Sequence, residues 1–342
     1  YIVHCAYAEK FIEPFIEFVE NNFDSNRHLF IVRENDKFKI TKRSNVIFIN
    51  KAVGKIYQIK TYVQLLNKAD KIILHGFFDR PIFLLLFFQP WLLKKCYWVI
   101  WGGDLYWYQN RPKTFRSNQF EKIRAFVIKR IGHFVTHVKG DYELAQKWYG
   151  ATGQYHECFM YPSYLYKEYA TPEKLGRTVN ILLGNSADPT NNHLELLDKL
   201  ATYKEENIFI YCPLSYGDIE YADRVAKRGK EIFGDKFIPL MDFMPLKKYL
   251  EILGQTDIGI FAHKRQQGMG NITTLLGLGK KVYMRSDVTS WATFEQLGVR
   301  LYDVNEIEMT RIDAGIAKRN REVISRYFSE TNLINQLTEI FE

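Results

Sequence analysis

The feature that most constrains the fold is a repeated alternation of short, strand-like segments with stretches of helical pattern. In the first half, the segments with the composition of buried strands are YIVHCA, HLFIVR, KIILHG, CYWVIW and HFVTHV. In the second half, the alternation restarts with VNILLGNS, NIFIYCP, KFIPLM, DIGIFA and KKVYMR. Strands that alternate with helices are typical of parallel sheets covered on both faces. The sequence therefore predicts an α/β fold with two parallel sheets.

A change in composition separates the two series of strands. Residues 161–178 contain two prolines, one glycine and little apolar periodicity, as linkers do. We therefore expect an N-terminal domain over 1–165, a linker over 166–178 and a C-terminal domain over 179–320. A helical segment over 321–342 could pack back on the N-terminal domain. Two such domains would place a cleft between them, and ligands of these sheets bind at the carboxyl ends of the strands.

Charge is divided unevenly along the chain. Residues 1–170 carry 25 Lys and Arg against 15 Asp and Glu, a net charge of +10, whereas the remainder carries 22 against 24, a net charge of −2. Different partners are therefore expected for the two domains. The partner of the basic half could be nucleic acid, an anionic membrane surface or a phosphorylated substrate.

The longest apolar run is PIFLLLFFQPWLL, over residues 81–93. A bilayer-spanning helix needs about 20 apolar residues, so this run is too short. It is either a buried helix of the core or a helix that lies in the membrane interface. The second interpretation is favoured by basic and amphipathic aromatic residues in and around the run, which are Arg80, Trp91, Lys94, Lys95, Tyr97 and Trp98.

The segment over residues 111–130 is strongly basic, with seven basic residues and one acidic residue. A solvated helix face is the simpler interpretation. The alternative is contact with anionic headgroups or a lipid diphosphate, because each basic residue near such a surface is worth about 1 kcal/mol. The candidate acceptor- or membrane-binding residues here are Trp107, Arg111, Lys113 and Arg116.

Two strand-to-helix loops in the second half have features of a phosphate site. In ILLGNSADPTNNHLELL, Gly184 would allow a close backbone approach and Ser186 offers a hydroxyl group. In TDIGIFAHKRQQGMGNITTLLGLG, the free N–H groups at the helix start and the helix dipole favour an anion. Arg265 adds a fork suited to phosphate oxygens, and Gln266 and Gln267 can donate hydrogen bonds. Either loop alone could be a well-capped turn; together they predict a diphosphate ligand.

Two residues of the first half are candidate general bases. A buried strand ends in Gly102-Gly103, and these glycines would leave Asp104 exposed among aromatic rings. An aspartate that caps the next segment is the alternative. His75 ends the neighbouring strand and is the second candidate, with a structural role as its alternative. We expect no metal site, because His133 and His137 lack a carboxylate companion.

An ordered set of these motifs resembles glycosyltransferase family 56. The similar blocks, which run from about His75 to Trp291, are HGFFDRP, WVIWGGDLY, ILLGNSADPTNNH, KKYLEILGQTDIGIFAHKRQQGMG and SDVTSW. The family's known member adds 4-acetamido-4,6-dideoxygalactose (Fuc4NAc) during assembly of enterobacterial common antigen. The resemblance implies a GT-B fold, with two Rossmann-like domains facing a central cleft and no essential metal. It also implies a dTDP-linked sugar donor and an undecaprenyl-diphosphate oligosaccharide acceptor at the inner face of the cytoplasmic membrane.

The resemblance also assigns roles to individual residues. It places the donor loop at Gly184, Asn185 and Ser186, and it places Asp104 and His75 in the acceptor-side domain. The family's Arg-Gln-Gln-Gly-x-Gly run is matched by Arg265, Gln266, Gln267, Gly268 and Gly270. Ala187 and Asn271 replace a glycine and a threonine of the family pattern, which leaves the donor sugar open.

The sequence therefore predicts a peripheral glycosyltransferase on the cytoplasmic face of the cell membrane. Its C-terminal domain would bind a dTDP- or UDP-linked sugar, and its N-terminal domain a lipid-diphosphate-linked acceptor and the anionic membrane surface. No metal or other cofactor and no nucleic acid are expected. One alternative is a nucleotide-sugar 2-epimerase of GT-B architecture, which needs neither acceptor nor membrane. The other is a basic nucleic-acid-binding protein, which is disfavoured because the phosphate-type loops lie in the half with net charge −2.

Overall fold

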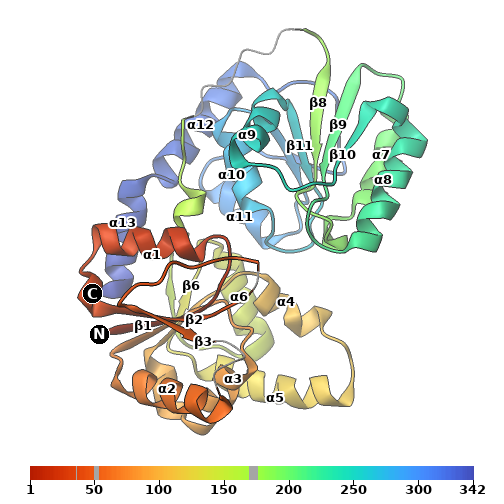
Figure 1. Ribbon diagram of the computed structural model, residues 1–342. Helices are drawn as coiled ribbons and strands as arrows, with labels where there is room; N and C mark the ends of the chain where they lie inside the picture. Colours follow the sequence, from red (N-terminus) through yellow and green to blue (C-terminus); the bar gives the residue numbers. More distant parts are fainter. Residues whose placement is uncertain (36, 50–53, 169–175) are drawn as a thin grey trace. The chain divides into compact units, whose positions relative to one another are not determined.

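The computed structural model describes residues 1–35, 37–49, 54–168 and 176–342. They form two compact units, each built on its own sheet (Figure 1). Unit 1 comprises Tyr1–Leu165 with Glu330–Glu342, and unit 2 comprises Tyr166–Ser329. Residues 169–175 of the expected linker lie outside the described residues.

The sheet of unit 1 has seven strands in the order β3-β2-β1-β4-β5-β6-β7, and every neighbouring pair is parallel. The strands are β1 Ile2–Tyr7, β2 His28–Arg33, β3 Val46–Ile49, β4 Lys71–His75, β5 Cys96–Val99, β6 His133–Val135 and β7 Gln154–His156. Side chains alternate along each strand, so Val3 and Cys5 join one core layer while His4 faces the opposite side.

Helices cover both faces of this sheet (Figure 1). One layer packs on the core that contains Val3 and Cys5 and consists of α2 Lys55–Lys68, α3 Arg80–Phe88, α5 Phe115–Arg130 and α6 Lys139–Tyr149. The opposite layer, against His4, consists of α1 Ile12–Asn22 and α13 Glu330–Phe341. The shorter helices of the unit are the 3₁₀ helices η1 Ser25–Arg27, η2 Pro90–Lys95 and η3 Pro162–Tyr164, and α4 Gly103–Asn110. The last helix of the chain therefore belongs to unit 1.

The sheet of unit 2 has six parallel strands in the order β10-β9-β8-β11-β12-β13. They are β8 Val179–Leu183, β9 Ile208–Pro213, β10 Phe237–Leu240, β11 Ile258–Phe261, β12 Lys281–Met284 and β13 Tyr302–Asp303. The helices are η4 Pro189–Asn191, α7 His193–Leu200, η5 Ala201–Tyr203, α8 Ile219–Phe233, η6 Gly234–Lys236, α9 Leu246–Gln255, α10 Met269–Gly277, α11 Thr289–Gln296 and α12 Ala314–Tyr327. The prediction of an α/β fold with two parallel sheets is confirmed.

Within the described ranges, no helix is both long enough and apolar enough to cross a bilayer. The apolar run over 81–93 divides instead into α3 and η2. In α3, Ile82, Phe83 and Leu86 are buried, whereas Leu84 and Phe88 are exposed. One face of α3 therefore belongs to the core, and its place in a membrane interface stays a prediction.

Candidate functional site

The two phosphate-type loops of unit 2 lie side by side, because β8 and β11 are neighbours in the sheet and both loops leave its carboxyl edge. The Gly184 amide donates to the carbonyl of Ile260 at 2.9 Å. Farther along, the Asn192 side chain donates to the carbonyl of Ala262 at 2.7 Å. These bonds join the start and the end of the first loop to the second.

Gly184 occupies a position that only glycine fits. Its φ of +69° lies in the left-handed region, and a Cβ added here would lie 2.2 Å from Nε2 of His193. His193 is itself buried, and burial lowers its pKa to about 4. A neutral imidazole therefore packs directly against the turn that ends β8.

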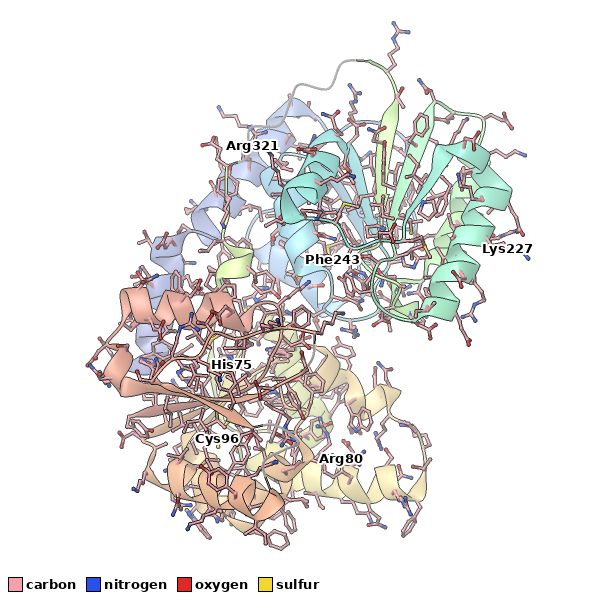
Figure 2. The ribbon with its side chains drawn as sticks, in the orientation of Figure 1. His75, Arg80, Cys96, Lys227, Phe243 and Arg321 are labelled. Carbon is pink, nitrogen blue, oxygen red and sulfur yellow. The ribbon has the colours of Figure 1, made fainter. Side chains whose placement is uncertain are left out.

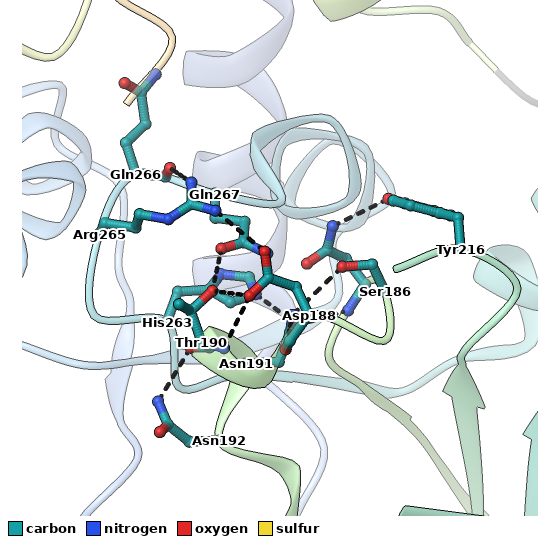
Figure 3. A network of polar contacts seen from close by, with 11 residues as sticks. Ser186, Asp188, Thr190, Asn191, Asn192, Tyr216, His263, Arg265, Gln266 and Gln267 are labelled. Carbon is teal, nitrogen blue, oxygen red and sulfur yellow. Dashed lines mark hydrogen bonds and ion pairs between the residues drawn. The ribbon is translucent and has the colours of Figure 1, made fainter. Parts of the chain in front are cut away.

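Asn191 organises the inside of the first loop. Its Oδ1 accepts the Asn185 amide at 3.0 Å and lies 2.7 Å from Nε2 of His263, which donates to it (Figure 3). Its amide nitrogen is 3.4 Å from Oγ of Ser186. Burial and the nearby Arg265 lower the pKa of His263 to about 3, so the ring is neutral. Sequence reasoning missed His263, although a histidine directly after a buried strand was the available signal.

An ion pair and a shared hydroxyl group join the two loops. Asp188 Oδ2 lies 3.3 Å from a guanidinium nitrogen of Arg265, which joins the first loop to the second. The Thr190 hydroxyl lies 2.7 Å from Asp188 Oδ1 and 2.7 Å from the side-chain amide of Gln267 (Figure 3). Burial alone would raise the pKa of Asp188, but the hydrogen bonds from Thr190 and the Arg265 charge lower it below its usual value. Arg265 is thus held in place by an ionised carboxylate.

The start of α10 is left open to a ligand. Gly268 has a φ of +67° and precedes the helix, whereas a Cβ on Gly270 would meet nothing within 4 Å. Arg265 precedes this glycine in the same loop and donates to the Gln266 carbonyl at 3.2 Å, while the Gln266 side chain points away from the network (Figure 3). Asn271 donates to the hydroxyl of Tyr249 at 2.8 Å. Uncovered helix amides beside a fixed guanidinium can bind an anion such as a diphosphate.

In unit 1, the expectation that Asp104 is exposed is wrong. Its side chain is 0% exposed, and its Oδ2 accepts from the Phe77 amide at 2.9 Å and from Trp98 Nε1 at 2.7 Å. Oδ1 accepts from the amides of Trp101 at 3.0 Å and Leu105 at 2.9 Å. Burial raises the pKa of Asp104, against the lowering effect of these hydrogen bonds. The carboxylate ties together the turns after β4 and β5, and its catalytic role stays a prediction.

His75 is a member of a buried hydrogen-bonded chain. Trp101 Nε1 donates to the Tyr161 hydroxyl at 2.7 Å, and that hydroxyl lies 2.8 Å from His75 Nδ1. His75 Nε2 is 3.0 Å from His4 Nδ1, and His4 Nε2 is 3.0 Å from His28 Nδ1. Figure 2 labels His75 within unit 1. Burial lowers the pKa of His75 to about 3. Both ring nitrogens are occupied, so its role as a base also stays a prediction.

The basic segment over 111–130 is only partly a surface feature. Arg124 is 3% exposed and points inward, where it donates to the carbonyls of Phe77 at 3.1 Å and Asp104 at 2.7 Å. Its guanidinium also pairs with the buried Glu121 at 3.3 Å. Of the predicted acceptor residues here, Trp107 and Arg111 are half-buried, and the two that are exposed are Lys113 and Arg116.

The outer surface of α2, α3, η2 and α5 combines apolar and basic residues. Among the described residues it exposes Ile56, Tyr57, Ile59, Leu84, Phe88, Trp91 and Phe115. The exposed basic residues include Lys60, Lys68, Arg80, Lys94, Lys122 and Lys129. Glu121 is the one acidic residue in the sequence of these four helices, and it is buried. Lys95 is half-buried and donates to the carbonyl of Asn67 at 3.2 Å. Sequence reasoning did not identify the exposed apolar residues of α2.

Comparison with solved structures places the chain among known folds. A glycosyltransferase from Rickettsia africae is 13% identical with a TM-score of 0.68, and the match covers 100% of this chain and 97% of that one. A sucrose-phosphate synthase from Thermosynechococcus elongatus is 10% identical with a TM-score of 0.69, covering 99% and 98%. A candidate UDP-N-acetylglucosamine 2-epimerase from Listeria monocytogenes is 13% identical with a TM-score of 0.54, covering 98% and 94%. At these identities the likeness shows the GT-B fold alone.

The family comparison carries more information, because it spans nearly the whole chain. The model described as 4-alpha-L-fucosyltransferase, glycosyl transferase group 56, matches residues 11–338. That range includes both loops of the anion site and the surface of α2, α3, η2 and α5. With its two parallel sheets and this match, the chain is a transferase of GT-B fold and belongs to glycosyltransferase family 56.

Proposed function

We propose that this enzyme transfers a dideoxy amino sugar such as Fuc4NAc from a dTDP-linked donor to a polyprenyl-diphosphate-linked oligosaccharide during synthesis of a surface polysaccharide. The acceptor would be met at the cytoplasmic face of the cell membrane, to which the protein binds peripherally. UDP is the alternative nucleotide of the donor. Membership of family 56 supports sugar transfer, and the following observations support the donor and the membrane.

The observation that carries the donor assignment is the placement of Arg265. Its guanidinium is held by Asp188 at 3.3 Å, beside a helix start where Gly270 leaves room for a ligand. A diphosphate could therefore receive hydrogen bonds from the first amides of α10 and from the planar fork of Arg265. Gly184 and Asn185, both in the loop after β8, form the other side of this site.

The same groups suit the chemical step. Negative charge grows on the nucleoside diphosphate as its bond to the sugar breaks, and fixed donors aimed at that charge lower the barrier. In this proposal Arg265 and the α10 amides supply the compensating charge, and no metal ion is assigned to it. The acceptor hydroxyl gives its proton to a general base, for which Asp104 and His75 are the sequence candidates.

The membrane assignment rests on the outer surface of α2, α3, η2 and α5. Exposed apolar side chains such as Phe88 and Trp91 can enter the headgroup region, while lysines such as Lys94 attract anionic lipids. Since this surface exposes no acidic side chain, nothing on it opposes that attraction. The acceptor's lipid tail lies in the same membrane, so attachment there would bring enzyme and acceptor together.

The two alternative functions receive less support. The likeness to the 2-epimerase structure extends to the fold alone, whereas the family match is to a transferase. The same family match argues against a nucleic-acid-binding protein. Both alternatives are therefore set aside in favour of sugar transfer.

A thermal-shift experiment with nucleoside diphosphates tests the donor assignment. A ligand that binds the folded state raises the midpoint in proportion to RT ln(1 + [L]/Kd), so dTDP should give a larger shift than UDP, GDP or ADP. Mass spectrometry of a short-chain polyprenyl-diphosphate oligosaccharide incubated with dTDP-Fuc4NAc should then show one added sugar. A protein that no nucleoside diphosphate stabilises would contradict the proposal.

A further inference from the structure

The carboxylate of Asp79 is held on one side and free on the other. Asp79 follows β4 and directly precedes α3. Its Oδ2 accepts from Nε of Arg33 at 3.0 Å and lies 3.0 Å from Nη2 of the same guanidinium. Within the described part of the chain, its Oδ1 has no hydrogen-bond partner, although the residue is only 5% exposed. A buried carboxylate oxygen without a partner is costly, so it calls for an explanation such as a catalytic role.

The ion pair lies at the carboxyl edge of the unit 1 sheet. Arg33 ends β2 and Asp79 follows β4, and β1 lies between these two strands. The Arg33 guanidinium is 5.8 Å from the ring centre of Tyr7, the last residue of β1. The residues on either side of Asp79, Phe78 and Arg80, are exposed, and Figure 2 labels Arg80. The turn after β4 therefore lies at the surface, at the edge where ligands of parallel α/β sheets bind, although its carboxylate is buried.

The two bases expected from the sequence have no such free atom. The oxygens of Asp104 accept four hydrogen bonds from N–H groups, and both ring nitrogens of His75 have hydrogen-bond partners. A substrate proton would have to displace one of these partners. Asp79, in contrast, can receive a proton at Oδ1 while Arg33 keeps its contacts with Oδ2.

We infer that Asp79 is the general base of the transfer reaction and takes the proton of the attacking acceptor hydroxyl on Oδ1. This inference rests on the proposed function, in which unit 1 binds the acceptor. The hydroxyl oxygen forms a bond to C1 of the donor sugar as its O–H bond breaks. The bond between C1 and the diphosphate oxygen breaks in turn, and its electron pair leaves with the nucleoside diphosphate. The proton then passes from Asp79 to solvent.

The surroundings of Asp79 suit this role. Burial raises the pKa of Asp79 above its usual value, and the charge and hydrogen bond of Arg33 oppose that rise. The higher pKa makes the carboxylate a better proton acceptor, while the neighbouring guanidinium favours its ionised form. Arg33 also fixes the direction of the carboxylate, because it contacts Oδ2 through two of its nitrogens.

Kinetic measurements on Asp79→Asn and Asp79→Glu test the inference, with dTDP-Fuc4NAc and a short-chain polyprenyl-diphosphate oligosaccharide as substrates. Asparagine has nearly the shape of aspartate but cannot take the proton, so kcat should fall about a hundredfold or more. Glutamate keeps a carboxylate and should retain more activity than asparagine. Both variants should bind dTDP with wild-type affinity in calorimetry, because the donor loops belong to unit 2.

The pH profile separates a base from a structural carboxylate. Wild-type kcat should fall toward acidic pH as Asp79 becomes protonated, and the residual activity of Asp79→Asn should lack this acidic limb. Glu13→Gln is the matched control, because it removes another ion pair of unit 1, to Arg43 at 2.7 Å, and leaves Asp79 unchanged. It should keep the wild-type kcat and pH profile.

A folded Asp79→Asn protein with near wild-type kcat would overturn the inference. An acidic limb that persisted in this variant would also overturn it and return the role to Asp104 or His75. If Asp79→Asn did not fold, the profile of Asp79→Glu would decide: a displaced acidic limb would support the inference, and an unchanged limb would overturn it. A wild-type protein without transfer activity on these substrates would overturn the proposed function together with the inference, whereas an active wild type with an equally active Asp79→Asn would overturn the inference alone.

Discussion

Asp188 Oδ2 and a guanidinium nitrogen of Arg265 lie 3.3 Å apart, although the two residues come from different loops of unit 2. The pair fixes the arginine before any ligand arrives, which reduces the entropy lost when phosphate binds. Arg265→Lys keeps the charge but loses the planar fork. We expect nucleoside diphosphates to bind this variant about tenfold more weakly, as measured by calorimetry.

The neighbouring Lys264 provides the control for this prediction. Lys264 is exposed, and Lys264→Gln removes a charge that does not belong to the site. It should change the affinity by less than roughly threefold, because exposed charges are screened by salt. If both variants weakened binding equally, general electrostatic attraction would explain the effect of Arg265.

Two glycines of the site should respond in opposite ways to substitution by alanine. Gly184→Ala forces a Cβ to 2.2 Å from His193 at a φ of +69°, so urea denaturation should show a loss of about 2–4 kcal/mol. Gly270→Ala meets nothing within 4 Å and should be as stable as wild type or more so. Its methyl group should nevertheless weaken pyrophosphate binding, because it covers the amides of α10. A Gly270→Ala variant with wild-type affinity would place the anion elsewhere.

Asp104→Asn separates a structural role from a catalytic one. The carboxylate is fully buried and accepts four hydrogen bonds from N–H groups. The amide nitrogen of an asparagine would point at some of these N–H groups and could not accept from them. We expect a loss of about 3 kcal/mol or more of unfolding free energy, measured by denaturation together with turnover. If the variant were as stable as wild type but inactive, Asp104 would be confirmed as the base.

The chain of His28, His4 and His75 should make unit 1 sensitive to acid. Burial lowers the pKa of His75 to about 3, that of His28 to about 4, and that of His4 well below its usual value. Below about pH 6.5 the unfolded chain therefore binds protons that the folded chain does not, and stability falls as pH decreases toward 4. Each histidine contributes up to about 1.4 kcal/mol per pH unit to this slope. His4→Gln should make the slope shallower in denaturation between pH 7 and pH 5.

The expected membrane attachment depends on exposed rather than buried apolar residues. Changing Leu84, Phe88 and Trp91 together to serine should release the protein from liposomes that contain anionic lipid, because all three are exposed. Phe209→Ser alters an exposed phenylalanine of unit 2 and should leave retention unchanged. Full retention of the triple variant would remove this surface from the proposal.

The sequence was sufficient to predict the fold class and the two loops of unit 2. Short apolar strands separated by helical stretches identify parallel sheets locally, and a glycine such as Gly184 marks a turn that other residues cannot adopt. Ser186 and Arg265 were found because parallel strands bring their following loops to one edge, whereas Asn185 was assigned by the family resemblance. These features depend on neighbours in the chain or on the pairing of adjacent strands.

The solvent exposure of individual side chains was harder to predict, because it depends on contacts between residues that are far apart in the sequence. Asp104 was expected to face solvent, but donors from Phe77 and Trp98 enclose it. Asn191 bonds to His263, which lies 72 positions away, and no local sequence pattern indicates such a contact. The outward apolar residues of α2, such as Ile56, were missed because a sequence pattern does not show which face of a helix is covered.

The 12-residue helix α13 completes unit 1, although all of unit 2 precedes it in the sequence. Unit 2 is an insertion within unit 1, so neither half of the sequence corresponds to one self-sufficient piece. During translation, every segment of unit 2 is made before α13, so Phe341 can pack on His4 and His28 only after unit 2 has been synthesised. The unit whose synthesis begins first is thus completed after unit 2, and a stop codon just ahead of Glu330 would remove Phe341 from His4 and His28 and leave α1 as the rest of that layer.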